Sequence, residues 1–310
     1  MGKVVVTGAN GFIGTALCNE LISRGHKVFA VVRERKPTGS TCEQLAGASL
    51  IRCDINNYND LTKYILDRDI DIFYHLAWAG TSGQLRGDVH RQMDNVRGTC
   101  DAVKAASELG CARFVFPSSI MEYEAWEIME SASNIPMPGF VYSAAKISAD
   151  YMGRAIASQY NLSYIRALVS NIYGPGENSE RLINTSLKRL LRKEHCSFSA
   201  GDQMYDFVYI DDAIRAFAAI GDSGKDGKTY YVGSGHPKPL KEFLKILGVY
   251  SGFPSGIGLG EMPFNGISLD YSSFDMDAVQ RDTGFAVNVS FEEGIKRTVA
   301  WMEAGMDEQF

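Results

Sequence analysis

The sequence has little that would suit a disulfide framework, a metal centre or a membrane span. Its 310 residues include six cysteines, none in a Cys-x-x-Cys pair, and five histidines without ligand-like spacing. No run approaches the ~18 apolar residues that a membrane span needs. Val4-Val5-Val6, near the start, is too short for a signal-peptide core. We therefore expect reduced thiols, no metal, no membrane partner and a cytoplasmic protein.

Positive charge is not in excess either. The chain has 31 Lys and Arg against 37 Asp and Glu, a formal net charge of −6. Such a chain has no bulk attraction to polyanions, so we expect no nucleic-acid partner. Any anion that it binds must be held by local groups. An apolar fraction of 45% is ample for a large core with a smaller lobe beside it.

Apolar runs alternate with helical patterns over the first ~170 residues. The runs predict strands at 4–7, 27–32, 50–53, 71–76, 113–117 and 164–169. Helices are expected at 12–23, 58–67, 95–109 and 142–159. This order predicts an α/β fold, a doubly wound parallel sheet of the Rossmann type.

The alternation loosens after Gly174-Pro175-Gly176, and Gly and Pro are frequent from 233 to 266. Ser290 and Glu293 have capping-box spacing ahead of a last helix. We expect a dinucleotide-binding domain of residues 1–170 plus about 206–232. The remainder of 171–310 would form a smaller C-terminal substrate-binding lobe.

A glycine-rich turn joins the first strand to the first helix. In Thr7-Gly8-Ala9-Asn10-Gly11-Phe12-Ile13-Gly14 the glycines have GxxGxxG spacing. Gly8 permits a tight turn, Gly11 lets the backbone approach a pyrophosphate, and Gly14 allows close packing of helix on strand. The helix N-terminus adds free N–H groups and a positive dipole end. This context predicts dinucleotide binding, with Phe12 and Ile13 beside the cofactor.

The end of the second strand favours NADP(H), with NAD(H) possible. Val32 stands where NAD sites usually carry an acid, and Arg33 can pair with a 2′-phosphate. Arg35 and Lys36 could add charge, whereas Glu34 could replace the missing acid. A solvated basic turn is the alternative. We expect Asp54 at the amino group of the adenine and Ile55 against its face.

Tyr142 and Lys146 are four residues apart at the start of a predicted helix and share one face. An ammonium beside a phenol favours the phenolate, which suits Tyr142 to proton transfer near neutral pH. Ser118 and Ser119 end the fifth predicted strand at the carboxyl edge, where α/β sheets bind ligands. Ser119 could hydrogen-bond a substrate carbonyl there, although a helix cap is the alternative.

Together these motifs resemble the NAD(P)-dependent epimerase/dehydratase family, the extended short-chain dehydrogenases that modify nucleotide sugars. The resemblance covers nearly the whole chain, and the motifs follow in the family's order. They are TGANGFIG at 7–14, His75-Leu76-Ala77, a helix start at Asn95-Val96-Arg97-Gly98-Thr99, Ser118-Ser119, YSAAK at 142–146, NIYGPG at 171–176, DFVYIDD at 206–212 and YVGSG at 231–235.

The resemblance implies further roles. Ser119, Tyr142 and Lys146 would be catalytic, and Lys146 would also hold the nicotinamide ribose. Leu76 and Ala77 would line the cofactor channel, with Asn95 near the active site. Ser118 would lie beside the substrate, and Asn171 would contact its sugar or diphosphate. The helices that start near Asn95 and Tyr142 would form the four-helix interface of a homodimer.

Several positions depart from the family pattern. Tyr205 replaces the usual Arg before Asp206, which puts a standard UDP-sugar pose in doubt. Trp78 could stack on a base or sugar, or could simply pack. Ile120 and Met121 stand where 4,6-dehydratases place an Asp-Glu pair, which argues against dehydration. Glu122 comes one position late and would point elsewhere.

Four functions remain open at this stage. The first is NADPH-dependent reduction of a keto group, such as a 4-keto group, on a nucleotide-linked sugar. The second is an NAD-dependent nucleotide-sugar 4-epimerase. The third is reduction of a small ketone or aldehyde that carries no nucleotide. The fourth is a dinucleotide-binding protein without catalysis, which the presence of both Tyr142 and Lys146 disfavours.

Overall fold

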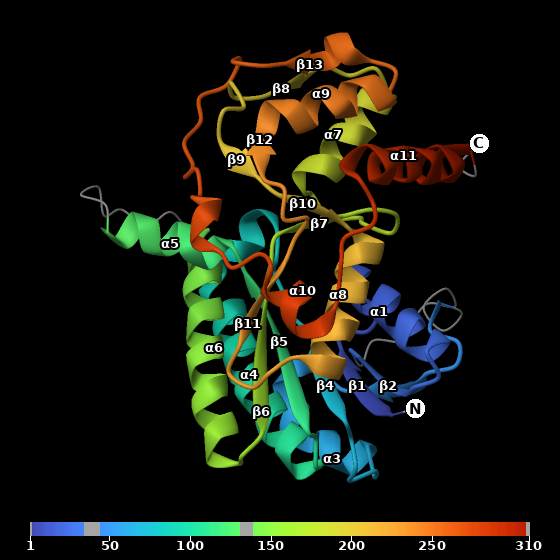
Figure 1. The fold of residues 1–310 in the computed structure, drawn as a ribbon, viewed down its shortest axis with the longest axis vertical. Coiled ribbons are helices and arrows are strands. Elements are labelled where there is room, and N and C mark those ends of the chain that lie inside the picture. Colours follow the sequence, from blue (N-terminus) through green and yellow to red (C-terminus); the bar gives the residue numbers. More distant parts are fainter. Residues whose placement is uncertain (1, 34–43, 131–138, 308–310) are drawn as a thin grey trace. The chain divides into compact units, whose positions relative to one another are not determined.

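The computed structural model describes residues 2–33, 44–130 and 139–307, which form two compact units. The first unit comprises Met1–Val169, Ile214–Val232 and Asp277–Phe285. The second comprises Ser170–Ala213, Gly233–Met276 and Ala286–Phe310. Figure 1 traces the chain through both units.

A seven-stranded parallel sheet is the centre of the first unit, in the order β11-β6-β5-β4-β1-β2-β3. The order reverses between β1 and β4, so the carboxyl ends of these two strands form the topological switch point. The predicted doubly wound sheet is confirmed. Its strands are β1 Lys3–Thr7, β2 Lys27–Val32, β3 Ser49–Arg52, β4 Ile72–His75, β5 Arg113–Ser119, β6 Ser163–Val169 and β11 Thr229–Val232.

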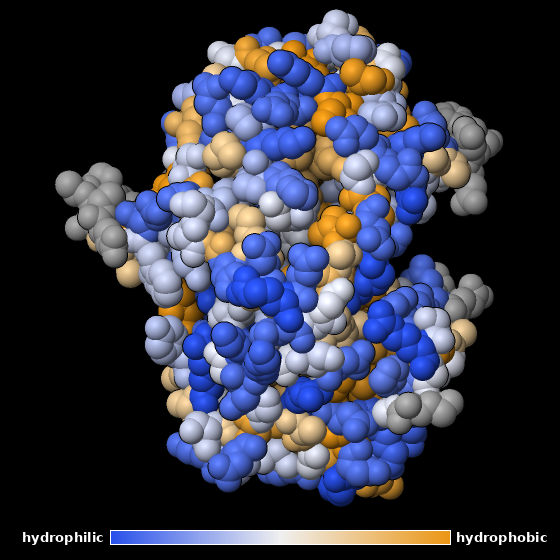
Figure 2. All heavy atoms as spheres, in the orientation of Figure 1, coloured by the Kyte–Doolittle hydropathy of each residue, from blue (hydrophilic) through white to orange (hydrophobic). Residues whose placement is uncertain are grey.

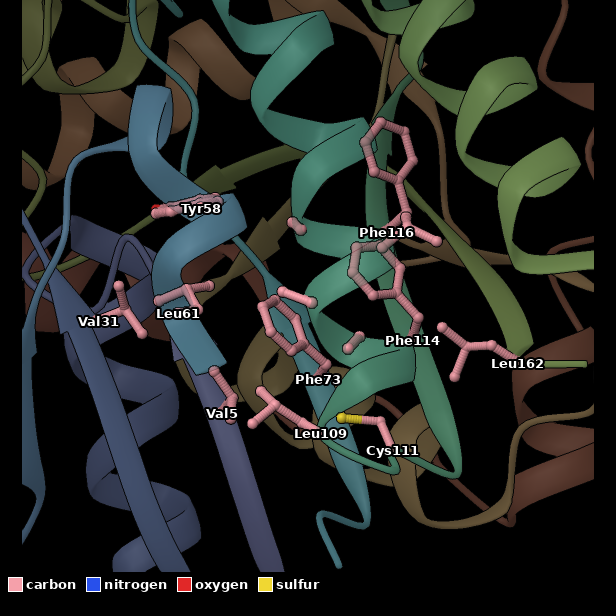
Figure 3. Packing of buried hydrophobic residues seen from close by; sticks show 14 of the residues in the cluster. Val5, Val31, Tyr58, Leu61, Phe73, Leu109, Cys111, Phe114, Phe116 and Leu162 are labelled. Atoms are coloured by element: carbon pink, nitrogen blue, oxygen red, sulfur yellow. The ribbon is translucent and has the colours of Figure 1, made fainter. Parts of the chain in front are cut away.

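Helices flank this sheet (Figure 1). One face packs against 3₁₀-helix η1 and helices α3, α4 and α6, and together with the strands these elements form the apolar cluster shown in Figure 3. Within it the Phe114 ring stacks on Phe73 at 5.3 Å and on Tyr164 at 5.5 Å, between centroids. On the other face Gly221 of α8 packs on the Tyr74 ring. The elements are α1 Phe12–Ser23, η1 Ile55–Asp60, α3 Leu61–Tyr64, η2 Gly83–Gly87, α4 Val89–Glu108, α5 Met121–Glu130, α6 Phe140–Gln159, α8 Ile210–Ser223 and α10 Ala278–Thr283.

The second unit is built from short strand pairs and helices. Strand β7 (Asn171–Tyr173) pairs in parallel with β10 (Phe207–Tyr209). The remaining elements are β8 Cys196–Ser197, β9 Met204–Tyr205, β12 Lys238–Pro239, β13 Ile257–Gly258, α7 Leu182–Leu191, α9 Leu240–Tyr250, η3 Pro254–Gly256, η4 Tyr271–Ser273 and α11 Phe291–Asp307. The Glu293 N–H donates to Ser290 Oγ at 3.2 Å, so the predicted cap of the last helix is confirmed.

Two predicted helices have different limits in the structure. The helix expected at 58–67 is η1 followed by the short α3, because Asp54 caps a 3₁₀ turn by accepting from Asn56 N at 3.0 Å. Helix α4 begins at Val89 instead of Asn95, because the Asp88 carboxylate accepts from Arg91 N and caps the helix there. Asn95 therefore lies within the helix, where it can face the sheet.

The boundaries of the units also differ from the predicted ones in two places. Residues 206–213 belong to the second unit, since β10 pairs with β7 of that unit, whereas 277–285 belong to the first, where α10 packs on β11. Helix α5 was not expected. On the face drawn in Figure 2, apolar residues are interspersed among hydrophilic ones. No helix in the described ranges is both long and apolar enough to cross a membrane.

Candidate active site

The glycine-rich loop packs so closely on itself and on the residues after β4 that side chains at Gly8 and Gly14 would not fit. Gly8 has φ +65°, and a Cβ there would lie 2.8 Å from the backbone N and Cα of Ala77. A Cβ on Gly14 would overlap the carbonyl oxygen of Gly8. Gly11 N donates to Gly8 O at 3.0 Å and closes the turn. The glycines therefore form a turn without side chains at the switch point between β1 and β4.

This turn has the properties of an anion-binding site. Gly11 is the N-cap of α1, makes no side-chain cap, and is followed by a first turn without acidic residues. The N–H groups and the positive end of the helix dipole are therefore available to a pyrophosphate. A pocket opens on the turn. It is lined by Gly8, Asn10, Gly11, Val31, Arg33, Ile55, Tyr58, Leu76, Ala77, Trp78 and Ala79.

Six of the twelve predicted cofactor residues line this pocket, namely Gly8, Gly11, Arg33, Ile55, Leu76 and Ala77. Arg33 lies on its wall at the end of β2, and Ile55 lies there at the start of η1. The Asp54 carboxylate is used in the cap of η1, and its contact with adenine stays a prediction. Phe12 and Ile13 form the first turn of α1 and are half-buried. Residues 34–36 lie outside the described residues.

A buried chain of hydrogen bonds ties β1, β4 and α4 together below the pocket. Ala77 N donates to Thr7 Oγ1 at 3.2 Å, Thr7 Oγ1 lies 3.0 Å from His75 Nδ1, and His75 Nε2 lies 3.0 Å from Thr99 Oγ1. Thr99 in turn donates to Asn95 O at 2.9 Å. Burial, with a smaller effect of Lys146, lowers the pKa of His75 to about 3. A neutral imidazole that accepts at Nδ1 and donates at Nε2 satisfies every link.

Asn95 fixes the loop that follows β4. Its Oδ1 accepts from Ala79 N at 2.9 Å and its Nδ2 donates to Ala79 O at 2.8 Å. Gln92, one turn earlier on α4, accepts from the indole Nε1 of Trp78 at 2.9 Å and donates to Gly80 O at 3.0 Å. Asn95 is completely buried. Its amide therefore holds the wall of the pocket in which Leu76, Ala77 and Trp78 lie.

Lys146 is the most deeply placed of the predicted catalytic residues, at 5% exposure. Its ammonium donates to Pro117 O at 2.8 Å and lies 3.7 Å from the centroid of the Trp78 ring. Desolvation lowers the pKa of Lys146 to about 7, although the Glu122 and Asp150 carboxylates act in the opposite direction. The charge of this side chain therefore changes near neutral pH.

Tyr142 lies one turn before Lys146 on α6 and is also buried. Its ring packs edge-on against Trp78, with 6.0 Å between centroids. The guanidinium of Arg86, from η2, lies 5.6 Å from the centroid of the Tyr142 ring. Trp78 thus contacts both Tyr142 and Lys146, and it packs as well as lining the pocket.

Ser119 and Ser118 occupy the end of β5, but their hydroxyls have different surroundings. Ser119 Oγ accepts from Met121 N at 3.3 Å, so its own proton can be donated to a ligand. Ser118 is buried and donates to Glu122 Oε1 at 2.7 Å. This placement favours a supporting role for Ser118 over the predicted contact with substrate.

The two remaining predicted substrate residues lie in the second unit. Asn171, on β7, donates through Nδ2 to Asp206 O at 3.0 Å. The Tyr205 ring, on β9, stacks on Phe207 with 5.5 Å between centroids. Both are partly exposed, and their contacts with a substrate stay predictions.

Sequence reasoning did not assign roles at this site to Gln92, Arg86 and Glu122. Gln92 and Arg86 carried no signal, because their importance depends on the conformation of the loop after β4. Glu122 did carry one, since Ser119-Ile120-Met121-Glu122 has the spacing of a capping box.

The comparisons with known proteins agree with this geometry. Residues 4–233 match the model of the NAD dependent epimerase/dehydratase family. The dTDP-glucose 4,6-dehydratase of Streptomyces griseus is 29% identical over 306 residues, which cover 96% of this chain and 93% of that protein. The 2-alkyl-3-oxoalkanoate reductase of Stenotrophomonas maltophilia is 27% identical over 336 residues, 96% of this chain and 98% of that one.

Solved structures share the fold along the whole chain. The UDP-glucose 4-epimerase of Thermotoga maritima, solved with UDP-glucose, has a TM-score of 0.80 at 23% identity and covers 98% of this chain and 99% of its own. The dTDP-glucose 4,6-dehydratase of Streptomyces venezuelae, solved with NAD and TYD, has a TM-score of 0.80 at 24% identity, with coverage of 99% and 98%.

Gly14→Ala is expected to weaken dinucleotide binding by about tenfold or more, ~1.4 kcal/mol, because the new Cβ displaces the turn at Gly8. Fluorescence titration with NADPH and NADH measures the effect. Gly305→Ala on α11 is the control, since a Cβ there has open space. Equal affinities in the two variants would show that the turn does not hold the cofactor.

Lys146→Met is expected to remove a pH dependence of stability. Below about pH 7 the buried ammonium is charged in both states, and the folded state bears its full desolvation cost. As the pH rises, the folded chain loses this proton first, while the unfolded chain keeps it up to about 10.5. The unfolding free energy of the parent should therefore rise relative to Lys146→Met by about 1.4 kcal/mol per pH unit between ~7 and ~10.

Urea unfolding at a series of pH values measures this difference. Lys104→Met on α4 is the matched control, because Lys104 is exposed. If the Lys146→Met and Lys104→Met differences from the parent follow the same pH profile, Lys146 does not titrate in this range.

Proposed function

The chain belongs to the NAD dependent epimerase/dehydratase family, whose members are NAD(P)-dependent extended short-chain dehydrogenase/reductase enzymes, and from this premise we propose that it reduces a keto group of a nucleotide-linked sugar with NADPH. The observation that carries the proposal is that Tyr142 and Lys146 both contact Trp78, in the loop after β4, while Lys146 also donates to Pro117 O of β5, the strand that ends at Ser119.

The three residues divide the chemistry among them. A nicotinamide cofactor, when bound, would supply the hydride for the carbonyl carbon. The Ser119 hydroxyl donates a hydrogen bond to the carbonyl oxygen and orients it. The Tyr142 phenol gives its proton to that oxygen as the alcohol forms. Lys146, in its charged form, stabilises the phenolate that remains.

The preference for NADPH rests on the second strand. Val31 and Arg33 line the pocket on either side of Val32, so the described residues at the end of β2, up to Arg33, offer no carboxylate. Arg33 is exposed and can reach a 2′-phosphate with a charged, bidentate contact. A reductase exchanges its cofactor in each turnover, which agrees with an NADP(H) site.

Dehydration is disfavoured even though similar curated proteins are named dTDP-glucose 4,6-dehydratases. Ile120 is buried, and its N–H donates to Val169 O at 3.1 Å. Met121 begins α5. Neither residue offers the carboxyl group that removal of water from a sugar would use at these positions.

A second candidate is the reduction of a ketone that carries no nucleotide. It is supported by the relative from Stenotrophomonas maltophilia, whose name describes reduction of a 2-alkyl-3-oxoalkanoate. Tyr205 also supports it, because an aromatic ring replaces the cation that would meet a diphosphate. A screen of nucleotide-linked keto-sugars against simple 3-oxo acids, monitored by NADPH oxidation, separates the two candidates.

We further propose a homodimer formed through α4 and α6. These helices pack on one another, and each exposes large apolar side chains to solvent. Met93 on α4 is 60% exposed, and Tyr151 on α6 is 63% exposed. Burial of such side chains against a second copy would stabilise a dimer.

Tyr142→Phe is expected to lower kcat by roughly 10²–10⁴-fold while leaving NADPH affinity unchanged, because only the proton donor is lost. Steady-state kinetics with the substrate found in the screen, together with NADPH titration, measures both quantities. Tyr64→Phe on α3 is the control, since that ring is 51% exposed. Full activity in Tyr142→Phe would contradict the assignment of Tyr142 as the proton donor.

Arg33→Asp is expected to shift preference from NADP(H) towards NAD(H) by roughly 10- to 100-fold, the loss of a charged contact worth ~1.5–3 kcal/mol. The ratio of the two dissociation constants is the readout. Arg52→Asp, at the exposed end of β3, makes the same charge change away from the pocket lining. An unchanged ratio in Arg33→Asp would contradict the 2′-phosphate contact.

Met93→Glu combined with Tyr151→Glu is expected to convert the dimer to a monomer, because two buried charges would face each other across the symmetric interface. Sedimentation velocity gives the mass in solution. Leu66→Glu, at a position that is 79% exposed outside both helices, should leave the mass unchanged. A parent protein that sediments as a monomer would refute the proposal.

A further inference from the structure

Glu122 is a buried carboxylate directly behind the predicted catalytic serine. It lies in the first turn of α5 and is 1% exposed. Its Oε1 accepts from Ser119 N at 3.0 Å and from Ser118 Oγ at 2.7 Å, and its Oε2 forms an ion pair with Arg166 of β6. One side chain thus joins the end of β5, the start of α5 and the middle of β6.

A helix cap alone does not account for these contacts. The bond from Ser119 N to Glu122 is half of a capping box, and an acid in a first turn is favoured by the helix dipole. Such a cap works at an exposed position without a cation. Here the carboxylate is buried together with Arg166, which is itself 6% exposed, and burial of a charge pair is costly unless each partner is fully bonded.

Lys146 and Glu122 bind neighbouring residues of β5, since the Lys146 ammonium donates to Pro117 O at 2.8 Å and Glu122 Oε1 accepts from Ser118 Oγ at 2.7 Å. Glu122 and Asp150 are the two carboxylates that favour the charged form of the buried Lys146 amine. Asp150 is shared, since it pairs with Arg154 at 2.7 Å and with Arg166 at 3.6 Å. The titratable and charged groups around this cluster are His75 on β4, Arg86 on η2, Glu122 and Tyr123 on α5, Tyr142, Asp150 and Arg154 on α6, and Tyr164 and Arg166 on β6.

We propose that Glu122 is a positioning residue of the active site, which holds Ser119 through its backbone and favours the charged form of Lys146. This role rests on the proposed function, in which Lys146 stabilises the Tyr142 phenolate. Arg166 completes the arrangement, because its guanidinium fixes the carboxylate on the side away from the serines. One buried anion therefore couples the geometry of Ser119 to the charge of Lys146.

Titration of Lys146 by NMR tests the proposal without a substrate. In protein labelled with ¹³C-lysine, the Cε resonance of Lys146 is assigned by its absence from Lys146→Met. Glu122→Gln keeps the shape and an acceptor for Ser119 N but removes the charge. In Glu122→Gln, the pH at the midpoint of the Lys146 titration should fall by about 1 pH unit or more. Glu127→Gln, an exposed position one turn later on α5, should leave the midpoint unchanged.

Turnover gives the second readout. If the Lys146 midpoint falls from about 7 to about 6, the charged fraction at pH 7 drops about fivefold. Therefore kcat of Glu122→Gln at pH 7 should drop by about the same factor, with KM little changed, and should approach the parent value as the pH is lowered. A purely structural role would lower kcat equally at every pH.

Arg166→Gln keeps the test decisive if Glu122→Gln does not fold. Removal of this cation should raise the Lys146 midpoint, the opposite sign to Glu122→Gln. Midpoints that are the same in Glu122→Gln, Glu127→Gln and the parent would overturn the proposal even if the enzyme reduces ketones. Shifted midpoints in a protein that reduces no ketone would instead refute the proposed function and leave the coupling in place.

Discussion

The burial of one ammonium group is the constraint on which the candidate site depends. Lys146 is enclosed by the Trp78 and Phe116 rings and by the Pro117 carbonyl, and this enclosure lowers its pKa to about 7. A lysine in such surroundings stays charged only if anions lie nearby. Glu122 and Asp150 provide them, and the arginines on β6 and α6 hold these carboxylates in place. The surroundings of the Lys146 ammonium are thus set by the packing of α5, α6 and β6.

The order of strands in the sheet is a second constraint. It places the pocket on the glycine-rich loop beside Lys146 and its neighbours, all within the first unit. The order of strands reverses between β1 and β4, so the glycine loop and the loop after β4 meet at one edge. Thr7, His75 and Thr99 join the two strands to α4 by hydrogen bonds, and Asn95 fixes the pocket wall. Trp78, on that wall, contacts both Tyr142 and Lys146. These elements therefore set the geometry of the pocket and of Tyr142 together.

The sequence predicts those parts of this arrangement that depend on local signals. Strand β2 and helix α1 have their predicted limits, because apolar runs and the glycine spacing are local. The start of α4 was placed too late, since the cap at Asp88 lacks the usual pattern of a capping box. The pairing of Glu122 with Arg166 could not be predicted. The two residues are 44 positions apart, and they meet only through the register of β5 on β6, which pairs Phe116 with Arg166. The catalytic roles of Ser119, Tyr142 and Lys146 stay predictions, as do the substrate contacts of the second unit.

The nature of the bound nucleotide tests the central claim most directly. The purified protein is denatured, any released nucleotide is identified, and the native protein is titrated with NADPH and with NADH. A reductase that uses Arg33 to hold a 2′-phosphate should release little nucleotide and should bind NADPH more tightly than NADH. Co-purified NAD⁺, with no gain in affinity for NADPH, would contradict the account and would indicate an epimerase that regenerates its cofactor in each cycle.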